Sequence, residues 1–298
     1  MSAADLQDSR SHIPVMLPET LDFLAVRPDG TYLDGTIGLG GHATAIHARL
    51  SPAGKLLGLD LDEEALVIAR SKFSASSSPA SLHHLSYAEF PAILQKTGSG
   101  AVNGILLDLG LSSLQLDSVA RGFSFAAGGP LDMRFDGNAG RTAAELIFAS
   151  AEKELADIIY QYGEERRSRA IARSIKNLQS MESAADLTEA IRRVTPPAHR
   201  NRTLARVYQA LRIAVNGELD NLEKFLEIFT DYLAIGGRIV IISYHSLEDR
   251  LVKQTFRNLA KSGRLQVLTK RPLRPSAEEV DNNRRSAAAK LRAAERIG

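Results

Sequence analysis

The 298-residue sequence contains no cysteine, which excludes a disulfide framework and a thiolate metal site and favours a reducing compartment. No stretch approaches the roughly 18 consecutive apolar residues of a transmembrane helix. Residues 1–16 have no apolar run of the signal-peptide type. No set of side chains has the spacing of metal ligands. We therefore expect a cytoplasmic protein that needs neither a metal nor a membrane.

The net charge is also small, at +2, but the charged residues are unevenly distributed along the chain. Residues 250–298 carry 13 Lys/Arg and 4 Asp/Glu, and residues 192–212 carry six arginines and no acid. Such clusters fit a polyanionic partner such as RNA. A solvated basic surface and a flexible tail explain them as well, so charge alone leaves both interpretations open.

Strand-like and helix-like segments alternate through much of the chain, which predicts an α/β fold with a parallel sheet. Buried strands are predicted at residues 31–35, 54–62, 102–110 and 236–244, with helices at 41–50 and 62–73. Helical periodicity alone fills residues 141–195. We therefore divide the chain into a first core part (1–138), a helical insertion for substrate docking (139–211) and a second core part with a basic tail (212–298).

A glycine-rich loop follows the first predicted strand. Its sequence GLGGHA, residues 38–43, fits the dinucleotide pattern G-x-G-x-x-A, and Asp60 lies 20 residues past Gly40 at the end of the next strand. An acid there binds ribose hydroxyls in such folds. The alternatives are a nicotinamide dinucleotide, S-adenosyl-L-methionine, or a tight turn without a ligand. Carboxylates at the ends of two strands, Asp34 and Asp108, would repel a pyrophosphate and suit a cationic ligand, which favours S-adenosyl-L-methionine.

Two further segments carry polar groups next to predicted strands. In LGLSS, residues 109–113, spacing alone indicates that Ser112 and Ser113 cap a helix. In HSLED, residues 245–249, the same argument predicts Ser246 as the cap and Asp249 as its partner at the third helical position.

Seven blocks in a fixed order resemble one bacterial family. They are HIPVMLPE, DGTIGLGGH, ILLDLGLSS, RGFSF…GPLDMR, YGEERRSRAIARSI, ISYHSLEDR and the tail from residue 273. The chain resembles the small-subunit (16S) ribosomal RNA cytosine-N4 methyltransferases, called RsmH or MraW. The resemblance implies a Rossmann-like class I methyltransferase core with an inserted all-helical domain. It also implies methyl transfer from S-adenosyl-L-methionine to N4 of one cytidine in the decoding region.

The resemblance also assigns cofactor-binding positions. It implies contacts from Gly40, Gly41, His42, Asp60, Tyr87, Asp108 and Gln115. The sequence departs from the family pattern at Tyr244, where a phenylalanine is usual, and at Leu114, where many members have proline.

The cytosine amino nitrogen is a poor nucleophile, so the enzyme must orient its lone pair and accept a proton. The Pro-Pro-aromatic motif of many amino methyltransferases is absent after the strand at 102–110. We therefore take Ser112, and secondly His245, as the groups that face N4. A base edge is reached only when the base is flipped or single-stranded, and the basic segments would hold phosphates.

The expected partner is 16S ribosomal RNA in an assembled or nearly assembled small subunit, and a homodimer stays open. Three other functions remain as alternatives: a nicotinamide-dependent oxidoreductase, a non-catalytic RNA-binding assembly factor and a small-molecule methyltransferase.

Overall fold

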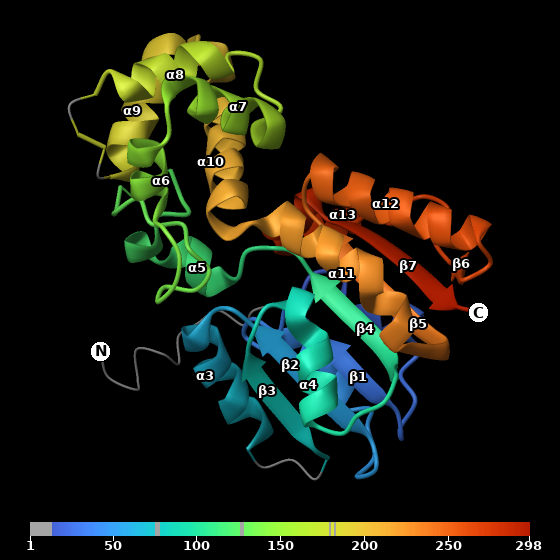
Figure 1. The fold of residues 1–298 in the computed structure, drawn as a ribbon. Helices are drawn as coiled ribbons and strands as arrows, with labels where there is room; N and C mark the ends of the chain where they lie inside the picture. The colour runs from blue at the N-terminus through green and yellow to red at the C-terminus, as the bar shows by residue number, and fades with distance from the viewer. Residues whose placement is uncertain (1–13, 75–77, 126–127, 179, 182) are drawn as a thin grey trace. The chain divides into compact units, whose positions relative to one another are not determined.

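A computed structural model describes residues 14–74, 78–125, 128–178, 180–181 and 183–298 (Figure 1). Residues 1–13 of the N-terminal stretch without a signal-type run, which include the first two residues of HIPVMLPE, lie outside this range. The chain forms two compact units, one comprising the chain up to Gly110 and from Asn221 on, the other Leu111–Asp220. None of the described helices is long and apolar enough to cross a membrane.

The first unit is built on a sheet of seven strands within the described residues, in the order β3-β2-β1-β4-β5-β7-β6. The strands are β1 Thr31–Asp34, β2 Lys55–Asp60, β3 Ala80–His84, β4 Val102–Asp108, β5 Leu233–Ser243, β6 Leu265–Val267 and β7 Lys290–Arg296. Strands β1 to β5 are parallel, whereas β7 is antiparallel to both β5 and β6. The sheet is therefore mixed, and the expectation of a purely parallel sheet is wrong for its last two strands.

Helices cover both faces of this sheet because its strands alternate buried side chains to either side. One face carries α4 Phe90–Lys96, α11 Glu218–Tyr232 and α12 Ser246–Lys261, packed on residues such as Leu33 and Ile105. The other face carries α1 Leu17–Leu24, α2 Gly41–His47 and α3 Glu63–Phe73, packed on residues such as Tyr32 and Leu106. The short elements η1 Tyr87–Glu89, α13 Ala277–Asn282 and η4 Arg284–Ala288 complete the unit.

The second unit is helical and has its own apolar core. Its elements are α5 Ser113–Asp117, η2 Val119–Arg121, α6 Ala143–Ala149, α7 Glu152–Gly163, α8 Ser168–Lys176, α9 Ala184–Val194, η3 Pro197–His199 and α10 Arg200–Asn216. Side chains of α6 to α10 form the core together with Phe123, Leu131 and Met133 from the segment before α6. The helical unit therefore begins at Leu111 and ends at Asp220. The sequence predicted that it begins at residue 139 and ends at residue 211.

The predicted fold class, a Rossmann-like class I methyltransferase core with an inserted all-helical domain, is confirmed by this sheet order and these two units. The basic tail is not a loose extension. Its strand β7 lies between β5 and β6 and buries Leu291, Ala293 and Ala294.

Candidate functional site

The glycine loop runs from the carboxyl end of β1 to the start of α2. Gly40 adopts a left-handed conformation, with φ of 81°, which favours glycine. At Gly35 the backbone passes so close to its neighbours that a Cβ atom would lie 2.4 Å from Leu107 Cδ2 and 2.9 Å from Tyr87 Cβ. A Cβ at Gly38, in contrast, would meet no atom within 4 Å. The loop is thus packed on one side and open at Gly38.

Asp60 ends β2 and holds this loop in place. Its Oδ2 accepts the Gly38 N–H at 2.7 Å, and its Oδ1 accepts the Asp62 N–H at 2.9 Å. Burial raises the pKa of the Asp60 carboxyl to about 6, although these hydrogen bonds favour the charged form. Because a carboxylate offers about four acceptor sites, the Asp60 oxygens can still accept from a ligand hydroxyl.

Asp34 ends β1 and is almost fully buried, with 1% of its surface exposed. Burial raises the pKa of its carboxyl to about 7, and the hydrogen bond from the Thr36 N–H opposes that shift. Repulsion from Asp108 and Asp60 raises it further. Three carboxyl groups therefore meet at the ends of the adjacent strands β2, β1 and β4; we call Asp34, Asp60 and Asp108 the acidic edge.

Asp108 ends β4 and is connected to both sides of the loop. Its N–H donates to Thr36 Oγ1 at 2.6 Å, and its Oδ2 lies 3.8 Å from Nδ1 of His42. The other ring nitrogen, His42 Nε2, donates to the Val15 carbonyl at 2.9 Å. The Tyr244 hydroxyl hydrogen-bonds Asp108, and burial, with the nearby Asp108 charge, raises the pKa of that phenol well above its usual value.

Tyr87 lies on η1, directly after β3. Its half-buried ring makes an edge-to-face contact with Phe225 of α11, with 5.8 Å between ring centroids. Together with its approach to Gly35, this contact holds the tyrosine beside the glycine loop. The structure thus brings together six of the predicted cofactor residues: Gly40, Gly41, His42, Asp60, Tyr87 and Asp108.

Ser112 and Gln115 belong to the second unit. They form a capping box at the start of α5, in which Ser112 Oγ accepts the Gln115 N–H at 3.2 Å and Gln115 Oε1 accepts the Ser112 N–H at 3.1 Å. The helix-cap interpretation of Ser112 is therefore confirmed, and Ser113 is the first residue of the helix.

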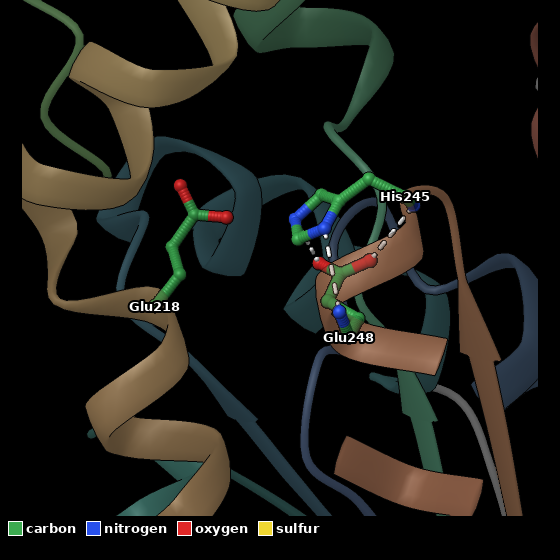
Figure 2. Close-up of side chains that lie close together, drawn as sticks. All are labelled: Glu218, His245 and Glu248. Atoms are coloured by element: carbon green, nitrogen blue, oxygen red, sulfur yellow. Dashed lines mark hydrogen bonds and ion pairs between the residues drawn. The ribbon is translucent and has the colours of Figure 1, made fainter. Parts of the chain in front are cut away.

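His245, the other predicted catalytic group, caps α12 (Figure 2). Its Nδ1 accepts the Glu248 N–H at 3.3 Å, and Nε2 lies 3.1 Å from Glu248 Oε1. Glu248 Oε2 in turn accepts the N–H groups of Tyr244 and His245. The prediction of Ser246 and Asp249 as cap and partner is wrong by one residue, because Asp249 instead pairs with Arg292 and Lys290.

Sequence reasoning missed two polar residues of this region, Thr36 and Tyr244. Thr36 connects the ends of β1 and β4, since its N–H donates to Asp34 and its hydroxyl accepts from Asp108. The sequence signal that could have identified Thr36 is its hydroxyl group, one residue after Gly35 at the end of the first predicted strand. Tyr244 was noted only as a departure from a family pattern, and its contact with Asp108 depends on the pairing of β4 with β5.

Nearly the whole chain is similar in sequence to known proteins. A sequence profile described as the MraW methylase family matches residues 9–297. The chain is 46% identical to the ribosomal RNA small subunit methyltransferase H of Kosmotoga olearia, over 98% of this chain and 99% of that protein. The protein of the same name from Thermosipho africanus is 47% identical over 96% of this chain and 98% of its own length.

Among solved structures, an rRNA methylase from Streptococcus thermophilus is 11% identical, with a TM-score of 0.46 over 97% of this chain and 100% of its own. The fold class stands on the strand order and not on this likeness. The family is shown by the two sequence relatives and by the profile, which extend over nearly the whole chain. The chain belongs to the MraW methylase family, with relatives named as methyltransferases of small-subunit ribosomal RNA.

Proposed function

We propose that this protein transfers the methyl group of S-adenosyl-L-methionine to the exocyclic N4 of one cytidine in the decoding region of 16S ribosomal RNA. Membership of a methylase family excludes the nicotinamide-dependent oxidoreductase as the first alternative. The observation that carries the proposal is the acidic edge, because three carboxyl groups beside an open glycine loop suit a cationic ligand and repel a pyrophosphate.

The residues of this edge fit the methyl donor. Asp60 would accept from the ribose hydroxyls, the Tyr87 ring would lie along the adenine, and the open backbone at Gly38 would let the ligand approach closely. S-adenosyl-L-methionine, when bound, supplies an electrophilic methyl group on a positively charged sulfur. Asp108, oriented by Thr36 and Tyr244, would face the cationic end of that ligand.

From the start of α5 in the second unit, the family resemblance assigns Gln115 to the donor, and we propose Ser112 as the group that faces N4. The Ser112 hydroxyl uses one lone pair for the Gln115 N–H and keeps its proton and a second lone pair for a substrate amino group. Turning the N4 lone pair toward the methyl group is an orientation effect, which contributes roughly 7–11 kcal/mol in ideal cases. His245 is the second group that we propose near N4, and its imidazole is held by Glu248.

The test is the transfer of tritiated methyl from S-adenosyl-L-methionine to small ribosomal subunits from a strain that lacks this modification. We expect one methyl group per subunit, recovered after nuclease digestion as N4-methylated cytidine. An Asp108→Ala variant should transfer no label, while an Asp22→Ala variant, changed at a position of α1 that takes no part in the site, should transfer as the wild type does.

Label in another nucleoside, or at C5 of cytosine, would contradict the proposed position of transfer. Binding of 16S ribosomal RNA without any transfer of label would favour the non-catalytic assembly factor. Rapid methylation of free cytidine would favour a small-molecule methyltransferase.

A further inference from the structure

Five exposed arginines gather at one end of the helical unit. Three come from the turn between α7 and α8 and the first turn of α8, one from the last turn of α9 and one from the first turn of α10 (Figure 1). We call this group the arginine end: Arg166, Arg167, Arg169, Arg192 and Arg202. The sequence pattern indicated only the last two, since the others are 23 or more positions earlier in the chain than Arg192.

A buried glutamate holds these segments together. Glu165 is 5% exposed; its Oε1 accepts the Arg167 N–H at 3.0 Å, and its Oε2 accepts from Thr203 Oγ1 at 3.2 Å. The Arg206 guanidinium lies 3.5 Å from the same Oε2. Arg167 also donates from Nη1 to the Val194 carbonyl at the end of α9. The starts of α8 and α10 and the end of α9 are therefore fixed beside one another.

Four guanidinium groups lie outside this network. Among the described residues, no carboxylate lies within ion-pair distance of Arg166, Arg169, Arg192 or Arg202. Other arginines of the same unit are neutralised, in the pairs Arg193–Glu189, Arg206–Glu165 and Arg212–Glu218. Pairing thus divides the arginines into a paired set and an unpaired set, and Arg166, Arg169, Arg192 and Arg202 of the unpaired set lie at this end.

The same end contradicts a local rule of helix electrostatics. Helix N-termini favour acids and disfavour cations, and α6, α7 and α9 follow the rule with Glu145, Glu152 and Asp186 in their first turns. Neither α8 nor α10 has an acid in its first turn or a side chain that caps it. Both carry exposed arginines there instead. A sequence that breaks a local rule without a structural gain often does so at a functional surface.

We infer that the arginine end binds the phosphodiester backbone of the RNA substrate, so that the helical unit holds the RNA while the other unit holds the methyl donor. This inference rests on the proposed function. A phosphate backbone supplies the negative charge that the unpaired guanidinium groups lack. Arginine suits this role because its planar group donates two parallel hydrogen bonds to one phosphate. The one exposed acid on the α7–α8 turn, Glu164, leaves the balance positive.

The test compares two triple variants of the full-length protein. Arg166→Ala/Arg169→Ala/Arg202→Ala removes three charges from the arginine end. Arg141→Ala/Lys153→Ala/Arg173→Ala removes three exposed charges elsewhere in the same unit. Filter binding to unmodified 16S ribosomal RNA is measured between low and physiological salt. The affinity of the first variant should fall about tenfold or more, and the slope of log affinity against log salt should decrease by about 2 to 3.

Stability supplies the second readout. Removing cations from two helix starts should leave the melting temperature unchanged or raise it, so loss of RNA affinity together with higher stability separates binding from folding. A third variant with lysine at the same three positions should keep most of the salt slope and lose part of the affinity. Equal affinity and slope in the two alanine variants would overturn the inference.

The two proposals fail separately. If the wild type transfers methyl groups and the first variant binds RNA normally, the arginine end is wrong and the proposed function stands. If the wild type transfers none but the first variant alone loses RNA affinity, the arginine end stands and the proposed function is wrong.

Discussion

The two units of this protein differ in the sign and the burial of their clustered charges. In the first unit, three carboxyl groups lie at one edge of a sheet. Burial raises the pKa of two of them, Asp34 to about 7 and Asp60 to about 6. In the second unit, arginines are left exposed at helix starts where cations are unfavourable. A net charge of +2 hides both features. The contrast indicates that each unit is prepared for a partner of the opposite charge.

The desolvation penalty on a charged group explains why the carboxyl groups are buried and the arginines are exposed. A buried carboxyl group can protonate and so reduce its desolvation penalty, but arginine stays charged in proteins. The acids can therefore be placed deep in the fold, where their charge responds to a ligand. Arginines without an acidic partner are kept in solvent, where a polyanion can reach them.

The largest expected effect concerns Asp34. Its carboxyl pKa is about 7 in the folded protein against a usual value of 3.8, so the folded state binds the proton more tightly than the unfolded chain does. Stability should therefore fall as pH rises from about 4 to 7, by up to about 4 kcal/mol. An Asp34→Asn variant should lose this part of the slope, as measured by urea unfolding between pH 4.5 and 8.

The Asn variant keeps an oxygen that can accept the Thr36 N–H, so a lost hydrogen bond does not confound the comparison. Parallel stability curves for the two proteins would show that Asp34 is ionised in the fold. The acidic edge would then be a fixed charge and not one that responds to a ligand.

Asp60 should give the next effect. Replacement by alanine removes a charged acceptor from ribose hydroxyls and releases the Gly38 N–H, and we expect donor affinity to fall about 10- to 150-fold, or roughly 1.5–3 kcal/mol. Calorimetry with S-adenosyl-L-methionine measures it. Asp62→Ala is the matched control, since Asp62 caps α3: it should cost about 1 kcal/mol of stability and change donor affinity little. Equal donor affinities in both variants would refute the ribose role.

A smaller effect is expected at Gly40. An alanine there must adopt a φ of 81°, which costs roughly 1–2 kcal/mol. The Gly40→Ala variant should show this loss in thermal unfolding together with weaker donor binding. Gly98→Ala is a control for the conformational cost, because Gly98 also has positive φ but lies between α4 and β4. A loss of donor affinity in the control as well would show that the loop is not the ligand site.

The smallest effect is expected at His245. Asparagine is a good helix cap, so His245→Asn should keep the melting temperature within a few degrees while removing the imidazole. Because Nδ1 already accepts the Glu248 N–H, we expect methyl transfer to slow by less than about tenfold at saturating substrates. A larger drop in kcat with an unchanged fold would establish the imidazole as a catalytic group.

The sequence predicted the acidic edge well because its determinants are local. Asp34, Asp60 and Asp108 each follow an apolar run directly, and parallel strands bring their carboxyl ends to one edge of the sheet. The antiparallel β7 was not predicted, because its short alternation of Leu291 and Ala293 is hidden in a basic tail. Pairing with β5 decides its structure.

The arginine end was only partly predictable for a related reason. Counting charges in the segment 192–212 groups Arg206 and Arg212 with Arg192 and Arg202. In the structure, however, Arg206 forms an ion pair with Glu165, and Arg212 forms one with Glu218. Arg166 and Arg169 join the surface through the packing of α8 against α7 and α9. Such contacts depend on tertiary structure, which charge patterns in sequence do not specify.

The most direct test of the central claim is the rate of tritiated methyl transfer to unmodified small subunits, measured while the concentrations of donor and subunit are varied separately. We predict that Asp60→Ala raises the KM for S-adenosyl-L-methionine alone. The triple alanine variant of Arg166, Arg169 and Arg202 should raise the KM for the subunit alone. If both variants raised the same KM, or if the wild type transferred no methyl group, the division of the two partners between two oppositely charged surfaces would be contradicted.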